Sequence, residues 1–349
     1  MEHYNGTYVR CDQSRETIKL DAVGEESLKI ISGTIKSPHK PETSWIAKVS
    51  HSSNDYFRGK IIPLEGCEEG FPHKEIEVTL DTSTSNTTPR LKVKYLPSDE
   101  PVIQFEQTSQ YFRTVRITVA HQEGIAPVLS FNPHDFIGAP ADLPNKPIGL
   151  TDVFENAGIA IDLQVTEQAV PFIPEGRFRS WDEYSLHRAM EEHWTYFRDE
   201  PQWALWVLCA DKYIEGRHVL GIMFDNFGEH QRQGVAVFYD SIEKDIACKG
   251  CTVTLAKWFD MMKFWTLCHE IGHAFNLRHP FRETKSHNWL SPKQEQQLPY
   301  FMHYPYLEPW NIQRYFEHFR YEFSKLNLLF LRHAPEHFVR MGDDAWSKL

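Results

Sequence analysis

Residues Cys268 to Pro280 read C-H-E-I-G-H-A-F-N-L-R-H-P. Residues four apart lie on the same face of a helix, so His269 and His273 can direct their imidazole nitrogens at a single ion. Glu270 lies one step further around the helix, close to that ion without having to ligate it. Its carboxylate therefore suits a general base that acts on a metal-bound water.

A third histidine, His279, follows six residues after His273, and Asn276 between them could end the helix and turn the chain back. Three neutral imidazoles with one open position are typical of a catalytic zinc site, whereas a structural site closes all four positions. The stretch therefore predicts a catalytic Zn²⁺ centre.

A second pattern lies downstream, where residues 301–305 read F-M-H-Y-P. Together with the elongated histidine motif, it resembles the metzincin clan of zinc endopeptidases, whose members carry a methionine-containing turn beneath the metal. The resemblance implies three zinc ligands, which are His269, His273 and His279. It also implies that Glu270 is the catalytic base, that Met302 is the turn methionine, and that Tyr304 ligates zinc or stabilises the tetrahedral intermediate.

The chain departs from the clan pattern at Asn276, where clan members usually carry glycine. That glycine permits a positive φ at the helix end, and asparagine is the next most tolerant residue there, so the substitution is physically mild. Pro280 after the third histidine is closest to serralysin-like members. The resemblance is tight at the motifs and loose elsewhere in the C-terminal part of the chain, and it indicates no named family within the clan.

Length and charge set outer bounds on the function. The chain has 349 residues, enough for two domains with their own cores, and a net charge of −11, which argues against nonspecific nucleic-acid binding. No stretch has the length of uncharged apolar residues that a membrane span needs. The start at Met1 shows neither a basic nor an apolar leader region, which favours the cytoplasm, while leaderless secretion and a removed leader stay open.

The six cysteines are too scattered for a disulfide framework, which suits a reducing compartment. Cys248 and Cys251 form a lone C-x-x-C. As a second zinc site it lacks a partner pair, and as a redox motif it lacks the expected βαβ setting, so a loop before a helix is the simpler interpretation.

Residues 1–105 predict a small antiparallel β-sandwich. Polar and apolar residues alternate over Glu75–Leu80 and over Leu91–Tyr95, and a turn-forming cluster separates these two runs. Further candidate strands are Ile18–Leu20, Leu28–Ile31 and Trp45–Val49. No catalytic pattern occurs here, so we interpret this domain as accessory, used for positioning or for binding a partner or ligand.

Residues 106–349 predict the catalytic domain. A strand over Phe112–Val119, a helix over Leu150–Gly158 that ends at a C-cap glycine, and a strand over Ile159–Val165 follow one another. This order resembles the start of a metzincin catalytic domain. The predicted fold class is therefore α+β: a metzincin-like domain with a mixed twisted sheet, an active-site helix and a mainly helical C-terminal subdomain at about 280–349, preceded by the all-β domain.

Further elements can be placed within this domain. The active-site helix is predicted over Val253–Asn276, another helix begins at a capping box of Ser180 and Glu183, and a third spans Asn311–Leu331. By the resemblance, Gly234–Asp240 is an edge strand above the zinc, along which an extended protein or peptide substrate would pair. Other histidines, which include His187, His193, His333 and His337, are interpreted as packing, surface or hydrogen-bonded groups.

The sequence thus predicts a zinc-dependent endopeptidase that hydrolyses peptide bonds with a Glu270-activated, zinc-bound water. A zinc amidase or deacylase acting on a non-peptide substrate would use the same chemistry at the carbonyl. A non-catalytic binding protein with a structural zinc is a further alternative, although a structural site needs no base. A last alternative is a protein whose function lies in the β domain, with the metal domain as an accessory.

Overall fold

The computed structural model describes residues 2–12, 15–36, 42–66, 71–82, 88–98, 101–172, 180–214, 218–245, 254–280, 298–306 and 311–344. These residues form two compact units. The first contains the chain up to Arg113 together with Leu328–Pro335, and the second contains the other described residues from Thr114 onward. The domain boundary that the sequence places near residue 105 falls within a strand of the first unit.

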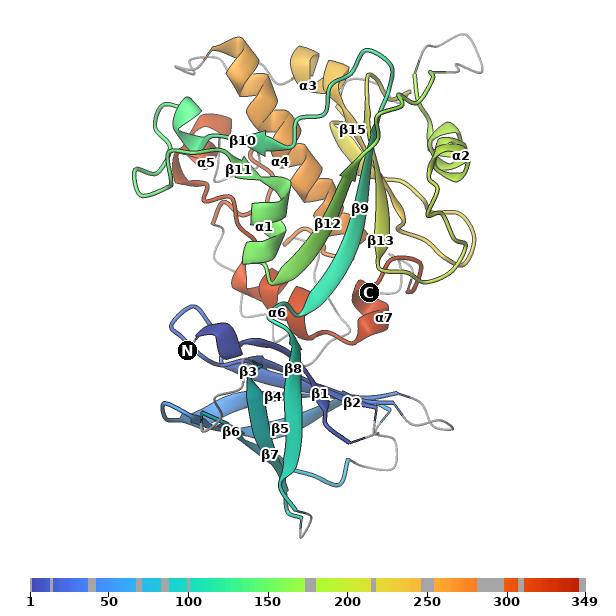
Figure 1. Ribbon diagram of the computed structural model, residues 1–349. Coiled ribbons are helices and arrows are strands. Elements are labelled where there is room, and N and C mark those ends of the chain that lie inside the picture. Colours follow the sequence, from blue (N-terminus) through green and yellow to red (C-terminus); the bar gives the residue numbers. More distant parts are fainter. Residues whose placement is uncertain are drawn as a thin grey trace. The chain divides into compact units, whose positions relative to one another are not determined.

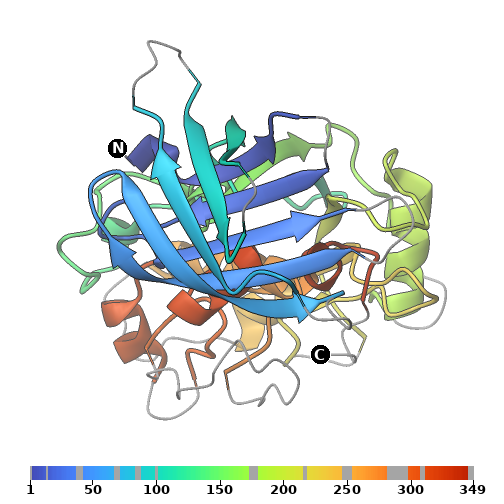
Figure 2. The ribbon, with the colours of Figure 1, turned by 90° about the horizontal axis from the view of Figure 1, so that it is seen from below.

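A closed antiparallel β-barrel forms most of the first unit (Figures 1 and 2). After a short 3-10 helix, η1 (Glu2–Tyr4), its strands are β1 (Gly6–Arg10), β2 (Glu16–Asp21), β3 (Ile30–Ile35), β4 (Thr43–Ser52), β5 (Tyr56–Glu65), β6 (Glu75–Leu80), β7 (Arg90–Leu96) and β8 (Ile103–Ser109). Each strand pairs with the next one in sequence, and β1 pairs with β8, which closes the barrel.

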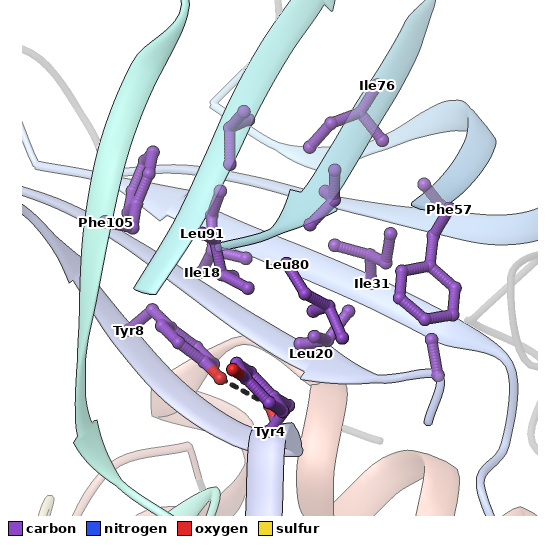
Figure 3. Close-up of a cluster of buried hydrophobic side chains, with 14 of the residues drawn as sticks. Tyr4, Tyr8, Ile18, Leu20, Ile31, Phe57, Ile76, Leu80, Leu91 and Phe105 are labelled. Atoms are coloured by element: carbon purple, nitrogen blue, oxygen red, sulfur yellow. Dashed lines mark hydrogen bonds between the residues drawn. The ribbon is translucent and has the colours of Figure 1, made fainter. Parts of the chain in front are cut away.

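Apolar side chains from alternate positions fill the barrel. In β6 every second residue is buried, as expected when successive side chains point to opposite faces of a strand. Figure 3 shows this cluster, in which the Tyr8 hydroxyl donates a hydrogen bond to the Tyr4 carbonyl (2.5 Å). Trp45 is fully buried against Gly33, where any side chain would overlap the indole ring. The barrel interior is therefore a packed core.

The predicted sandwich is wrong, although its strands are present. Alternating burial looks the same in a sandwich and in a barrel, because both have one apolar and one polar face. The difference lies in the pairing of β1 with β8, with Tyr8 opposite Gln107 and Val9 opposite Glu106. That pairing joins residues about a hundred positions apart in the chain, and no local pattern encodes it.

The second unit is built on a mixed five-stranded sheet with the order β12-β9-β13-β15-β14. Its strands are β9 (Arg113–His121), β12 (Ile159–Val165), β13 (Ala204–Ala210), β14 (Gly221–Met223) and β15 (Gly234–Phe238). β13 is parallel to both β9 and β15, while β14 runs antiparallel to β15. A separate pair, β10 (Ser130–Phe131) with β11 (Ile148–Gly149), lies outside this sheet.

The helices of the described chain are α1 (Leu150–Asn156), α2 (Glu183–His193), α3 (Tyr239–Asp245), α4 (Leu255–Ala274), α5 (Ile312–His318), α6 (Lys325–His333) and α7 (Glu336–Val339), with a 3-10 turn η2 (Pro133–Asp135). β13 is buried on both faces, and Trp206 and Leu208 pack in one cluster with Leu186 and Met190 of α2. α4 packs on β14 and β15, on the side of the sheet away from α2 (Figure 1).

The predicted fold class is wrong in its second half as well. The described part of residues 280–349 forms three short helices, and Leu328–Pro335 belong to the barrel unit, so these residues do not form one mainly helical subdomain. The helix predicted over Asn311–Leu331 is interrupted between α5 and α6, where Tyr321 has a φ of 59°. The chain is a closed barrel joined to a mixed sheet with few helices, and not a metzincin-like α+β domain behind a sandwich.

Two smaller predictions also need correction. The capping box of α2 is formed by Asp182 and Ser185, two residues later than the predicted Ser180 and Glu183. The predicted edge strand Gly234–Asp240 corresponds to β15, which lies inside the sheet with β13 on one side and β14 on the other. Its backbone groups are used within the sheet, so a substrate strand cannot pair there.

Among the described residues, no helix combines the length and apolar character that a membrane span requires.

Candidate metal centre

Three imidazoles meet in the second unit. His269 and His273 lie one turn apart on α4, and His279 returns to them after the helix has ended. Each pair of their Nε2 atoms is separated by 3.1 Å. All three side chains are buried. This cluster could hold a metal ion.

The orientation of two imidazoles is fixed by backbone carbonyls. His269 Nδ1 lies 2.5 Å from the carbonyl oxygen of Phe301, and His273 Nδ1 lies 2.8 Å from that of Leu277. A carbonyl oxygen can only accept, so both Nδ1 atoms carry their protons and donate. The neutral rings therefore present Nε2 lone pairs toward each other, an arrangement that repels unless a cation lies between them.

Burial opposes protonation of this cluster. Desolvation, together with the nearby His273 and His279, lowers the pKa of His269 well below its usual value. A proton is thus a poor candidate for the missing positive charge. Neutral imidazoles are the form that binds a metal ion.

The chain reversal that brings His279 to the cluster is a Schellman motif. The amide of Leu277 donates to the Gly272 carbonyl (3.0 Å), and the amide of Asn276 donates to the His273 carbonyl (2.8 Å). Asn276 has a φ of 69°, the left-handed conformation that asparagine tolerates better than other non-glycine residues. The positive φ that the sequence implies at Asn276 is confirmed.

Glu270 is buried between α4 and the edge strand β14. Gly221 of β14 comes so close that a Cβ atom there would lie 2.6 Å from Glu270 Cγ and 2.8 Å from Thr266 Cγ2. Burial raises the pKa of the Glu270 carboxyl to about 8, against a hydrogen bond from the backbone of Met223 that lowers it. A carboxylate held in apolar surroundings next to such a cluster has the chemistry of a general base.

The residues around Met302 lie directly against the cluster. Besides the Phe301 carbonyl, the Tyr304 ring packs on His279 at 4.3 Å between centroids and on His269 at 5.6 Å. Met302 is fully buried, and a Cβ atom at Gly272 of α4 would lie 2.5 Å from its sulfur. At Gly272 the helix thus has no room for a side chain, because Met302 lies against it.

The structure brings together the residues that the histidine motif and the methionine turn single out, and it adds others. Trp265 stacks on His269 at 4.8 Å, and its place one turn before His269 on the same helix was a usable signal. No sequence signal marks Gly221 and Met223, because they reach Glu270 only through sheet pairing. Cys248 and Cys251 lie outside the described residues.

Comparison with known proteins finds no matching family model, no matching curated protein and no matching solved structure. The local geometry of the cluster is therefore the basis on which a function can be argued.

Proposed function

We propose that this protein is a zinc-dependent hydrolase that cleaves peptide bonds, with His269, His273 and His279 as the zinc ligands. The observation that carries the proposal is the convergence of three buried Nε2 atoms at 3.1 Å, two of them in rings whose Nδ1–H groups are already donated to carbonyls. Between two such neutral rings no hydrogen bond can form. A cation explains the arrangement.

The spacing fits zinc. A tetrahedral zinc ion with nitrogens at about 2.0–2.1 Å separates its ligand atoms by about 3.3–3.4 Å. The spacing here is 3.1 Å, so a small outward movement of the rings accommodates the ion. Three imidazoles leave a fourth position for water or substrate, as in catalytic sites. A bound zinc ion would supply a Lewis acid that acidifies a water molecule and polarises a carbonyl group.

Glu270 is the residue that moves the proton. It would accept a proton from the attacking water and deliver it to the leaving nitrogen of the scissile bond. The hydrogen bond from the Met223 backbone holds its carboxylate, and Gly221 lies so close to Glu270 that it has no room for a side chain of its own. A structural zinc site needs no such base, which favours an enzyme over a zinc-containing binding protein.

Among the described residues no strand pairs with the outer edge of β14, and an extended substrate can pair there. Leu220 accepts from Phe238, and Phe224 donates to Gly234, so these backbone groups face β15. Backbone groups alternate in direction along a strand, so those of Gly221 face outward. A peptide lying along this edge would approach Glu270 by β-augmentation.

Tyr304 is the proposed oxyanion-stabilising residue, because its ring packs on two of the ligand imidazoles. The resemblance of the motifs to metzincin endopeptidases supports these roles for residues 269–279 and 301–305. It does not extend to the fold.

The deciding test measures zinc content and casein hydrolysis together, with and without a chelator. Zinc in the purified protein and cleavage that the chelator abolishes are the expected results. Glu270→Gln should keep zinc but lose hydrolysis. The control is Glu243→Gln, which removes an α3 carboxylate that pairs with Lys263 of α4 (2.6 Å), and it should keep both zinc and hydrolysis. Proteolysis that persists in the Glu270 variant would sink the assignment.

A non-peptide amide is the nearest alternative substrate. Zinc binding without casein cleavage, followed by hydrolysis of small acylated amines that depends on Glu270, would replace the peptidase by a deacylase. Absence of zinc from the wild-type protein would contradict both forms of the proposal.

A further inference from the structure

Arg232 is a fully buried guanidinium at the end of the metal-site helix. Its Nη1 donates to the carbonyl oxygen of Ala274, the last residue of α4, at 2.8 Å. Its Nη2 donates to the Arg340 carbonyl at 2.6 Å, and its Nε donates to the Asp344 carbonyl at 2.8 Å. The side chain thus ties the C-terminus of α4 to a segment that lies more than sixty residues further along the chain.

The position of Arg232 is itself constrained. Its φ is 70°, and its amide donates to the Asp225 carbonyl at 3.0 Å. The neighbouring Gln233 is fixed in the same way, because its amide donates to the Asp225 carboxylate at 2.9 Å. An unfavourable backbone conformation at a residue that is not glycine persists only where its surroundings demand it. Here it lets the guanidinium reach Ala274.

A second contact ties the same turn to the same downstream segment. Asn276 Nδ2 donates to the Phe338 carbonyl at 2.9 Å, so Ala274 and Asn276 are both linked to residues 338–344. Between His273 and His279 these contacts and the Schellman bonds fix the path of the backbone. A buried cation at the C-terminus of α4 is also favoured by the helix dipole.

We propose that Arg232 is a positioning residue for the metal centre: by clamping the end of α4 through Ala274, it holds the turn that delivers His279 to His269 and His273. This inference rests on the proposed function. Arg232 touches neither ligand nor substrate, so its loss should weaken metal binding and leave the chemistry at the bound metal intact. The planar fork of its guanidinium matters, because a lysine ammonium is a point charge on a different stem.

The chain contains a matched control in the other unit. Arg113 is also buried, and it binds the end of a helix by the same chemistry: Nε donates to the Leu331 carbonyl (2.7 Å) and Nη2 to the Ala334 carbonyl (2.5 Å), at the C-terminus of α6. Arg113→Lys therefore reproduces the cost of disturbing a buried arginine on helix carbonyls, without touching α4.

The experiment compares Zn²⁺ affinity, measured by competition with a chelating dye, in wild type, Arg232→Lys and Arg113→Lys. Loss of a contact that orients a metal ligand typically lowers metal affinity by about 10–100-fold, and we expect a loss in this range for Arg232→Lys. Arg113→Lys should bind Zn²⁺ like the wild type. Hydrolysis per bound zinc should be the same in all three proteins.

Amide hydrogen exchange of the metal-free proteins provides a second readout that needs no metal. The amides of Asn276 and Leu277, which make the Schellman bonds, should exchange faster in Arg232→Lys than in the wild type. In Arg113→Lys they should exchange at the wild-type rate. Equal affinities in wild type and Arg232→Lys, or equal losses in both variants, would overturn the inference and leave the proposed function standing. Absence of Zn²⁺ binding in the wild type would overturn both.

Discussion

Buried histidines occur in both units, and their surroundings differ. His333 in the barrel unit has a protein group at each ring nitrogen: Ser32 Oγ lies 2.9 Å from Nδ1, and Asp21 Oδ2 lies 3.4 Å from Nε2. Asp21 also receives a hydrogen bond from Arg332 Nη1 at 2.9 Å. In the second unit His269 and His273 each place Nδ1 on a protein carbonyl, and their Nε2 atoms face each other.

The contrast separates two uses of a buried imidazole. A histidine that serves structure is satisfied by hydrogen bonds from the protein alone, since unsatisfied buried polar groups destabilise the fold. A histidine that serves a metal keeps one nitrogen oriented and leaves the other for the ion. Burial alone would not distinguish the groups, because both are almost fully covered.

The sharpest way to break this comparison is to remove one histidine of each kind. His273→Ala should abolish metal binding, and with it the stabilisation that metal gives the folded chain, which is about 4 kcal/mol when free metal is at 1,000 times its dissociation constant. His333→Ala should keep the metal. Elemental analysis and thermal unfolding with and without chelator measure both. Full metal content in His273→Ala would contradict the distinction between metal-binding and structural histidines.

The next effect concerns Asp21, whose carboxylate pairs with Arg332 and His333 in the barrel unit. Asp21→Asn leaves Arg332 buried without its ion pair, which should destabilise the protein by about 3–5 kcal/mol while metal affinity stays unchanged. The control is Asp12→Asn, whose pair with Arg10 lies at the surface and should contribute about 0–1 kcal/mol. Urea unfolding measures both changes. Equal effects of the two substitutions would show that burial of the Asp21 pair is irrelevant.

A smaller effect tests how closely the metal-site helix packs on its turn. A methyl group at Gly272 would lie 2.5 Å from Met302 Sδ and 3.3 Å from Phe323 Cε1, so Gly272→Ala should destabilise the protein by about 1–3 kcal/mol. Met302→Ala removes the sulfur, and the double variant should recover part of the loss. A double-mutant cycle measures this coupling, and strictly additive effects would contradict the contact.

The last effect is the pH dependence that His333 gives to the stability of the barrel unit. Burial lowers the pKa of His333 to about 4, against the opposing influence of Asp21. Below pH 6.5 the unfolded chain binds a proton at His333 that the folded chain does not, so stability falls as the pH falls from about 6.5 to about 4, with a slope of at most about 1.4 kcal/mol per pH unit. His333→Gln should remove this slope. Urea titrations at several pH values measure it, and an unchanged slope would assign it to other groups.

Local patterns predicted the parts of this molecule that local physics determines. The bounds of β12 agree with the predicted strand, α1 ends before Gly158 as predicted, and Asn276 adopts the positive φ that the motif implies. The histidine spacing on α4 carries its own geometry, because a helix fixes which residues share a face. These features depend on neighbours within a few residues.

The errors come from contacts between distant residues. The closure of the barrel by β1 and β8, and the interior place of β15, depend on which strands pair. Apolar and aromatic residues recur at helical spacing in the helix predicted over Asn311–Leu331, yet the structure ends α5 at His318 and begins α6 at Lys325. Gly221 reaches Glu270, and Arg232 reaches the end of α4, from segments that show no motif of their own.

The barrel unit includes Leu328–Pro335, which lie far along the chain from its strands, and this has a consequence for biosynthesis. Its eight strands leave the ribosome before the second unit does, but Arg332 and His333, which pair with Asp21, are added more than two hundred residues later. Until then Asp21 lacks both partners and Arg113 lacks its carbonyl acceptors. The unit that is translated first is therefore completed late, and a fragment cut after Arg113 would be an unfinished domain.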